Sequence, residues 1–238
     1  METGRMLYEG KAKKLYETDD PGLLYLTYKD SLTAFNAKKK AEMAGKGELN
    51  NNISAWIFTY LKDRGVESHF IKRIDDLSQT VRPVTIVPLE VVVRNVTAGS
   101  ICRRLGVPQG TPLPRPLVEL YYKNDDLDDP LVLEDHALLF GWADEADLKK
   151  IKRLALQVNE LLIELFSSLD IDLVDFKLEF GKDRDGRLIL ADEISPDTCR
   201  FWEKGTQNSL DKDRFREDLG DVLGAYREIW RRLSKRGR

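Results

Sequence analysis

Cysteine and histidine are scarce in this chain of 238 residues, which contains two of each. Two cysteines, Cys102 and Cys199, can form at most one disulfide bond, which excludes a scaffold held together by several disulfides. The two histidines, His69 and His136, lack the spacing of a zinc site or of a histidine-based catalytic triad. Any catalysis therefore depends on carboxylates, lysines and arginines, or on a metal ion with oxygen ligands such as Mg²⁺.

Long apolar runs are also absent, because no stretch approaches the roughly 18 residues of a membrane helix, and no signal peptide follows Met1. We therefore expect a cytoplasmic protein with reduced cysteines and no membrane partner. The net charge of −3 argues against nucleic acid as a partner. The glycine-rich phosphate loop, the dinucleotide-binding fingerprint and the protein-kinase motifs are missing as well. If ATP binds, it must bind by a different scheme.

Hydrophobic periodicity predicts a mixture of strands and helices. The expected strands cover 6–8, 14–16, 23–28, 68–74, 80–96 and 121–123, and the expected helices cover 49–61, 97–106, 148–165 and 219–233. The polar segment 30–46 is expected to be a flexible loop. Pro83 and Pro88 predict a break in the strand over 80–96, and 84–87 would form a hinge between two domains. This order of elements indicates an α+β fold rather than a doubly wound parallel sheet.

The segment 173–181 alternates charged and apolar residues, so that Asp175, Lys177 and Glu179 would share one face of a strand. Such alternation most often marks the solvated face of an antiparallel sheet. Three observations favour a functional face instead. The three residues carry both signs of charge, a following hairpin adds Asp192 at the same level, and an irregular polar loop over 195–200 brings another cation.

A hairpin should follow this strand, because Asp185-Gly186 is typical of a two-residue loop. With that loop, Arg184 pairs with Arg187 and Glu179 lies directly opposite Asp192. Two carboxylates that face each other across a ladder repel, and a cation between them would stabilise the pair. The hairpin therefore predicts a cation site.

Two other segments could contact an anion. Lys11 and Lys13 lie in a glycine-containing turn between two early strands, where backbone amides and lysines can reach a phosphate. Arg94 lies on the strand just ahead of a predicted helix whose first turn carries Ser100, and there free amides, a guanidinium and a hydroxyl suit an anion. Each also has an ordinary interpretation, since lysines in turns are mostly solvated and serine often only caps a helix.

Several segments together resemble the SAICAR synthetase family, in order over about residues 7–226. The matching segments are YEGKAK at 8–13, GKG at 45–47, VVVRN at 91–95 with AGS at 98–100, VDFKLEFG at 174–181, DEISPD at 192–197 and DKDR at 211–214. The resemblance implies an ATP-dependent ligase of de novo purine biosynthesis that joins carboxyaminoimidazole ribonucleotide to L-aspartate through an amide bond. It also implies a small N-terminal antiparallel sheet domain, placed at 1–86, and a larger α+β domain, placed at 87–238. ATP would lie in the cleft between them, and a homo-oligomer is expected from the family alone.

The resemblance further implies roles for residues at the matching positions. The residues expected to bind ATP are Lys11, Ala12, Lys13, Leu15, Leu24, Ile86, Lys123, Glu179 and Asp192, and the last two would also hold Mg²⁺. The residues expected to bind the ribonucleotide substrate are Arg94, Ser100, Arg200, Asp211 and Arg216. Lys177 and Asp175 are the expected catalytic residues, facing the imidazole carboxylate. One position departs from the family, because Asn36 replaces the aspartate that other branches often carry.

The expected mechanism starts from the fact that a carboxylate is a poor electrophile. Transfer of the γ-phosphoryl group of ATP to it would give an acyl phosphate, which the aspartate amine can attack. Lys11, Lys13, Lys177 and Mg²⁺ would neutralise charge. Asp175 is a candidate acceptor of the amine proton, and the alternative is that it pairs with Lys177 and only orients it. A small-molecule kinase and a non-catalytic nucleotide sensor are the competing functions.

Overall fold

The structure, a computed structural model, describes residues 3–34 and 38–236 and consists mainly of two antiparallel sheets. The small sheet has the strand order β1 (Met6–Glu9), β2 (Lys13–Glu17), β3 (Leu24–Tyr28), β7 (Ser78–Val81) and β6 (Phe70–Arg73). The large sheet has the order β10 (Leu131–Val132), β9 (Pro112–Tyr122), β8 (Thr85–Val96), β11 (Ile171–Lys182) and β12 (Leu188–Ala191), with β13 (Cys199–Glu203) beside β11. The predicted α+β class is confirmed, whereas the domain boundary at residue 86 stays a prediction.

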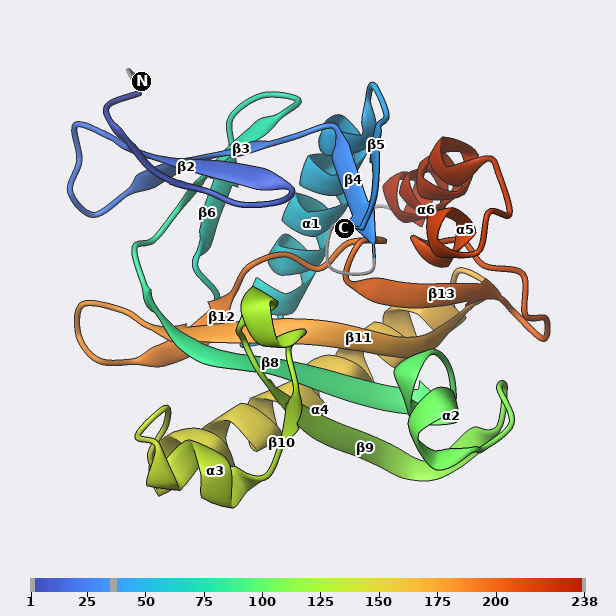
Figure 1. Ribbon diagram of the computed structural model, residues 1–238. Coiled ribbons are helices and arrows are strands. Elements are labelled where there is room, and N and C mark those ends of the chain that lie inside the picture. Colours follow the sequence, from blue (N-terminus) through green and yellow to red (C-terminus); the bar gives the residue numbers. More distant parts are fainter. Residues whose placement is uncertain (1–2, 35–37, 237–238) are drawn as a thin grey trace.

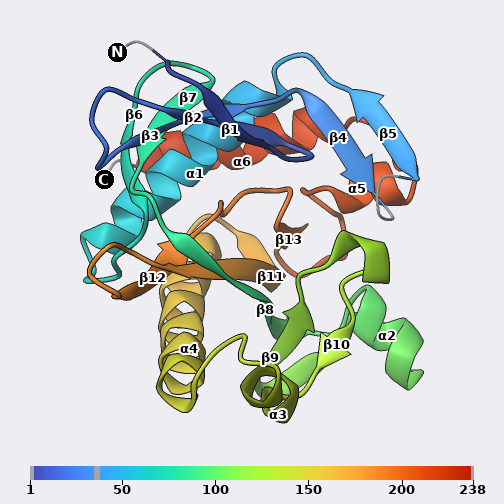
Figure 2. The ribbon, with the colours of Figure 1, turned by 60° about the vertical axis from the view of Figure 1, so that its left-hand side comes forward.

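Helices cover the sheets, as Figures 1 and 2 show. They are α1 (Lys46–Lys62), α2 (Ser100–Leu105), α3 (Glu134–Leu139), α4 (Glu145–Ser167), α5 (Asp213–Arg216) and α6 (Val222–Arg236), together with a 3₁₀ helix at Asp125–Leu127. Helix α4 packs against β8, β9 and β11 of the large sheet, whereas α1 packs against β3, β6 and β7 of the small sheet and also contacts α6. The apolar faces of α1, α4 and α6 share one core with the large sheet, which makes that sheet a rigid platform.

The polar segment 30–46 contains two paired strands, contrary to the prediction that it is a flexible loop. Strands β4 (Ser31–Ala34) and β5 (Lys39–Glu42) pair antiparallel. The Asp30 carboxylate accepts hydrogen bonds from the backbone N–H groups of Gly45 and Gly47, over 3.2 and 2.8 Å, and so fixes the entry into α1. Asn36 lies outside the described residues.

The predicted break between Pro83 and Pro88 is also displaced. Strand β8 runs through Pro88, and the chain leaves the small sheet earlier, at 82–84. The pairing of β8 with β11 shifts register between the Glu179 and Gly181 pairs, so Pro88 lies in an irregular stretch of the ladder. A proline is tolerated there because no ladder hydrogen bond needs its missing N–H.

The helix predicted over 97–106 begins at Ser100, and Gly99 rather than Thr97 precedes it. The Thr97 hydroxyl instead donates to the carbonyl of Pro108 over 2.6 Å and accepts from the backbone N–H of Thr111 over 2.9 Å. These two bonds close the loop after α2 and leave the start of the helix to glycine.

The hairpin of β11 and β12 has a different register from the predicted one, and the prediction that Glu179 lies opposite Asp192 is wrong. Glu179 pairs with Ala191. The loop contains three residues rather than two and ends with Gly186 at φ 74°. One additional loop residue shifts every pair by one position, which carries Asp192 beyond the end of β12.

Over the described residues, no helix is both long enough and apolar enough to span a membrane. Cys102 and Cys199 are both free thiols.

Candidate functional site

A cavity of about 810 Å³ lies where the small sheet faces the large sheet. All nine residues expected to bind ATP line it, contributed by the β1–β2 turn, β2, β3, β8, β11 and the segments after β9 and β12. Its apolar part is formed by Leu15, Leu24, Leu26 and Val81 of the small sheet and by Ile86 of β8. An apolar slot beside charged groups suits a flat heterocycle that carries phosphates.

A second cavity of about 280 Å³ lies beside the first, over β8, α2, β11 and β13. Four of the five residues expected to bind the ribonucleotide line it, namely Arg94, Ser100, Arg200 and Arg216. Glu90, Asp129, Lys177, Asp197 and Thr198 line both cavities. The two cavities therefore meet at these residues.

Lys177 is the central cation at this junction. Its Nζ lies 2.7 Å from Glu179 Oε1, 3.0 Å from Glu90 Oε1 and 3.3 Å from Asp192 Oδ2. Burial alone would lower the pKa of Lys177, but these carboxylates raise it well above its ordinary value. Lys177 is therefore a fixed positive charge that contacts both Glu179 and Asp192, although the two carboxylates are not ladder partners.

Lys13 approaches the same carboxylates from the small sheet. It forms a short ion pair with Asp192, and its Nζ lies 2.9 Å from Glu193 Oε1. Burial opposes its charge, but Asp192 and Glu193 outweigh burial and raise the pKa of Lys13. Burial also opposes the charge of Asp192, yet Lys13 and Lys177 hold the pKa of that carboxyl far below its ordinary value. Asp192 is thus ionised throughout the physiological pH range.

The backbone of Asp192 is unusual and is held by a buried histidine. Asp192 has φ 61°, a left-handed conformation that aspartate adopts at a cost. Its carbonyl oxygen lies 2.9 Å from Nε2 of His69, whose backbone N–H donates to the carbonyl of Leu190 over 2.8 Å. Burial, reinforced by the charge of Lys13, lowers the pKa of His69 to about 4. The neutral ring must therefore carry its proton on Nε2 to donate this hydrogen bond.

Glu179 and Asp192 have the donor chemistry of a magnesium site. Glu179 Oε1 also lies 2.7 Å from Lys123 Nζ. Among the described residues, no group of three or more His, Cys, Asp or Glu side chains is arranged to hold a metal ion. Mg²⁺ commonly takes one or two carboxylates and completes its shell with phosphate oxygens and water. The pair therefore fits Mg²⁺ in company with a polyphosphate, not as a site made by protein alone.

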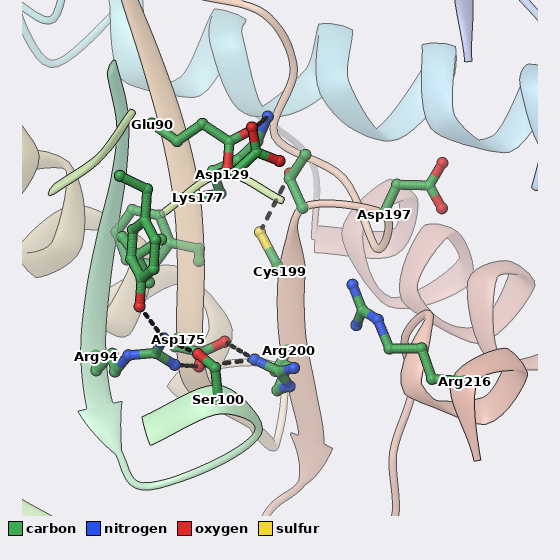
Figure 3. Close-up of a pocket in the computed structure, with 14 residues that line it drawn as sticks. Glu90, Arg94, Ser100, Asp129, Asp175, Lys177, Asp197, Cys199, Arg200 and Arg216 are labelled. Atoms are coloured by element: carbon green, nitrogen blue, oxygen red, sulfur yellow. Dashed lines mark hydrogen bonds and ion pairs between the residues drawn. The ribbon is translucent and has the colours of Figure 1, made fainter. Parts of the chain in front are cut away.

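The second cavity is organised by alternating charges, and Figure 3 shows Arg94, Ser100, Asp175 and Arg200 together at one end of it. Arg94 Nη1 and Arg200 Nη1 lie 2.6 and 2.9 Å from Asp175 Oδ2. Arg94 Nη2 donates to the Ser100 hydroxyl over 3.0 Å. Asp175 therefore contacts two arginines, and the predicted alternative in which it pairs with Lys177 is not found.

The chain of charges continues along α5. Asp213 accepts from Arg200 Nε over 2.6 Å and from Arg216 Nη1 over 2.5 Å. Asp211, also expected to bind substrate, lines neither cavity. It is fully buried and accepts from the backbone N–H groups of Phe201 and Asp213, over 2.8 and 2.7 Å. This arrangement gives Asp211 a structural role in connecting β13 to α5.

Several charged or polar residues of the cavities were not predicted, among them His69, Glu90, Glu193, Asp197 and Lys212. Asp197 and Lys212 lie inside segments that matched the family, so the motifs contained them without indicating a role. No sequence pattern indicates a role for Glu90, because a single charged residue in an apolar strand is common wherever the strand is half exposed.

Known proteins resemble this chain in sequence and in fold. The family model of SAICAR synthetase matches residues 6–233. The phosphoribosylaminoimidazole-succinocarboxamide synthase of Bacillus subtilis is 56% identical over 229 residues, covering 96% of this chain and 95% of that protein. The crystal structure of the Ehrlichia chaffeensis synthase has a TM-score of 0.94 and 48% identity, covering 97% of this chain and 98% of that one.

A further solved structure, a SAICAR synthetase of Type-2 in complex with ADP, has a TM-score of 0.93 and 50% identity. It covers 97% of this chain and 98% of its own. The agreement in sequence and in fold extends over nearly the whole of each protein. The chain therefore belongs to the SAICAR synthetase family, the ATP-dependent ligases of purine biosynthesis.

Proposed function

We propose that this chain joins carboxyaminoimidazole ribonucleotide to L-aspartate through an acyl phosphate, with SAICAR, ADP and phosphate as products. The observation that carries the proposal is the meeting of the two cavities at Lys177. A nucleotide in the larger cavity and a ribonucleotide in the smaller one would bring phosphate and carboxylate to the same lysine. Holding reactants in this way supplies proximity and charge neutralisation, the main contributions to phosphoryl transfer.

In the larger cavity, the adenine would lie between Leu15, Leu24 and Ile86, and the triphosphate would extend toward Lys13 and Lys177. Lys11, Ala12 and Lys123 would lie along the phosphates and ribose. Glu179 and Asp192 would hold Mg²⁺ together with phosphate oxygens. When bound, the ion would offset negative charge on the transferring group.

In the smaller cavity, Arg94, Ser100, Arg200 and Arg216 would bind the phosphate of the ribonucleotide. An oxygen of the imidazole carboxylate attacks the γ-phosphorus, and the bond to ADP breaks. The aspartate amine then attacks the acyl carbon, the carbon–oxygen bond breaks, phosphate leaves with the electron pair, and the departing phosphate takes the proton that the amine loses. Lys177 neutralises the carboxylate during the first step. Asp175, with its oxygens occupied by two arginines, would orient them.

The ligase is distinguished from a kinase and from a nucleotide sensor by its dependence on aspartate. We expect ADP release to require the ribonucleotide together with a nucleophilic amine, which is L-aspartate in the natural reaction. Hydroxylamine in place of aspartate should trap the acyl phosphate as a hydroxamate, measured by mass spectrometry. ADP release that ignores aspartate would contradict the ligase, and ligation without any hydroxamate would contradict the acyl phosphate. The expected homo-oligomer stays a prediction.

His69 offers a test of the nucleotide side of the site. In His69→Phe the carbonyl of Asp192 loses its donor, so the carboxylate is no longer fixed beside Lys13 and Lys177. Because a neutral hydrogen bond contributes about 1 kcal/mol, we expect the KM for ATP to rise roughly tenfold or less. His69→Gln retains an N–H donor and should recover most of the affinity.

The matched control is His136→Phe, which changes the other histidine, an exposed residue of α3. That variant should behave as the wild type. Equal KM values for ATP in His69→Phe and His69→Gln would show that the hydrogen bond to Asp192 does not matter. A rise in the KM for the ribonucleotide as large as that for ATP would show that the effect is not confined to the nucleotide.

A further inference from the structure

Lys212 differs from every other cation in the two cavities. Ten lysine and arginine side chains line one or both cavities, namely Lys11, Lys13, Lys14, Arg82, Arg94, Lys123, Lys177, Arg200, Lys212 and Arg216. Nine of them have a carboxylate within 4 Å among the described residues. Lys212 has no ion pair and no side-chain hydrogen bond within the described part of the chain. It is the one cation of the site whose charge the protein leaves without a direct partner there.

The carboxylate with the largest electrostatic effect on Lys212 is Asp197, which already accepts three hydrogen bonds from other side chains. Asp197 Oδ2 accepts from Lys46 Nζ over 2.7 Å and from Asn50 Nδ2 over 2.8 Å, and Asp197 Oδ1 accepts from the Tyr226 hydroxyl over 2.6 Å. The Asp197 side chain is only 5% exposed, and Lys46 is 1% exposed. A buried ion pair with these additional hydrogen bonds does not rearrange without a large cost in free energy.

Backbone hydrogen bonds fix Lys212 near Asp197. The N–H of Lys212 donates to the carbonyl of Pro196 over 3.1 Å, and its carbonyl accepts from the N–H of Arg216, also over 3.1 Å. The segment that follows Pro196 contains Asp197 and Thr198, which line both cavities. Lys212 therefore lines the larger cavity and is hydrogen-bonded to the segment that reaches the junction with the smaller one.

The electrostatic surroundings of Lys212 favour the binding of an anion. Burial lowers its pKa to about 8, the attraction of Asp197 and Glu193 opposes this, and Arg216 and Lys46 add to the lowering. An anion that reached the ammonium would compensate for burial and restore an ordinary pKa. An unpaired cation in a ligand cavity thus favours a negatively charged ligand group.

Three anionic ligands must be bound in the proposed reaction, and two already have cations. The nucleotide phosphates would meet Lys11, Lys13 and Lys123, and the ribonucleotide phosphate would meet the arginines of the smaller cavity. The third ligand is the dicarboxylic amino acid. We propose that Lys212 binds a carboxylate of L-aspartate, at the junction from which its amine can reach the acyl carbon beside Lys177. This inference rests on the proposed function and adds the location of the third substrate.

The test is the effect of Lys212→Met on each substrate separately. Because a hydrogen bond to a charged group is stronger than a neutral one, we expect the KM for L-aspartate to rise about 10- to 100-fold. The KM values for ATP and for the ribonucleotide should change about twofold at most. Lys212→Arg, which keeps the charge, should recover much of the lost affinity. The matched control is Lys149→Met, which removes an exposed lysine of α4 that lines neither cavity.

Hydroxylamine can act as the nucleophile but carries no carboxylate. It therefore distinguishes a Lys212 that binds the carboxylate of L-aspartate from a Lys212 that acts in phosphoryl transfer. Hydroxamate formation that persists in Lys212→Met while aspartate ligation falls would support the proposal. Equal losses in both reactions would place Lys212 in phosphoryl transfer and overturn it. Equal losses of ligation in the arginine and methionine variants would indicate a neutral lysine that accepts the amine proton, and would also overturn it.

Failure of this inference differs from failure of the proposed function. If the wild type depends on aspartate but the KM for aspartate is unchanged in Lys212→Met, only the role of Lys212 is refuted. If the wild type turns over ATP without regard to aspartate, the ligase itself is refuted, and the subsite with it.

Discussion

Replacing Glu179 by glutamine is expected to lower kcat roughly 100-fold while the fold is retained. A metal ion and its carboxylate together supply several kcal/mol of charge stabilisation, and a loss of about 3 kcal/mol corresponds to roughly this factor. The amide oxygen of glutamine can still accept a hydrogen bond from Lys177 or Lys123, so the packing should persist. ADP release at saturating substrates measures the loss, and thermal unfolding measures the fold.

The control is Glu134→Gln, which changes an exposed glutamate of α3 that forms only a surface ion pair with Lys152, at 3.5 Å. That variant should keep the wild-type rate. A second measurement, the dependence of rate on Mg²⁺ concentration, should shift to higher concentrations in Glu179→Gln only. Normal turnover in Glu179→Gln would remove Glu179 from the proposed metal site.

The register of the hairpin shows where sequence reasoning succeeded and where it failed. The alternation over 173–181 correctly indicated the strand and the charged face, because side-chain direction follows from period two alone. The register depends instead on which loop residue takes a left-handed conformation, and here it is Gly186 of the Asp185-Gly186 pair. The amino-acid sequence does not determine the loop length, since aspartate–glycine suits two-residue and three-residue loops alike.

The carboxylates nevertheless converge, for a reason that the hairpin argument did not contain. Asp192 leaves the ladder with φ 61° and contacts Lys177 from beyond the strand end. The contact that holds its carbonyl comes from His69, which is 123 residues away in the sequence. Only the three-dimensional packing of the two sheets brings these residues together, so no local pattern could have predicted the arrangement.

The same limit explains the other residues that sequence reasoning missed. The resemblance indicated nine residues that line the larger cavity. Five of them lie within the continuous matching segments, namely Lys11, Ala12, Lys13, Glu179 and Asp192. The contacts of Asp197 come from α1 and α6. These helices provide the partners of Asp197, and Lys212 has no ion pair among the described residues. Such a feature depends on the packing of several elements and leaves no local pattern in the sequence.

Removing Arg94 is expected to destabilise the protein strongly, by about 3–5 kcal/mol in Arg94→Ala. Arg94 is only 2% exposed and lies between two buried carboxylates, with Nε 2.7 Å from Glu119 Oε2 and Nη1 2.6 Å from Asp175 Oδ2. Alanine would leave Glu119 and Asp175 buried with less compensating charge. The free energy of unfolding in urea measures the loss.

The control for Arg94→Ala is Arg104→Ala, which removes another arginine bonded to Glu119 and to the Tyr121 hydroxyl. The Arg104 side chain is 28% exposed, so we expect a loss of about 1 kcal/mol or less. A loss that small in Arg94→Ala would contradict its role as the buried centre of the network. Because destabilisation alone can reduce activity, substrate binding must be compared at a temperature where both variants are folded. There, Arg94→Ala should raise the KM for the ribonucleotide far more than that for ATP, and equal effects would remove Arg94 from the phosphate site.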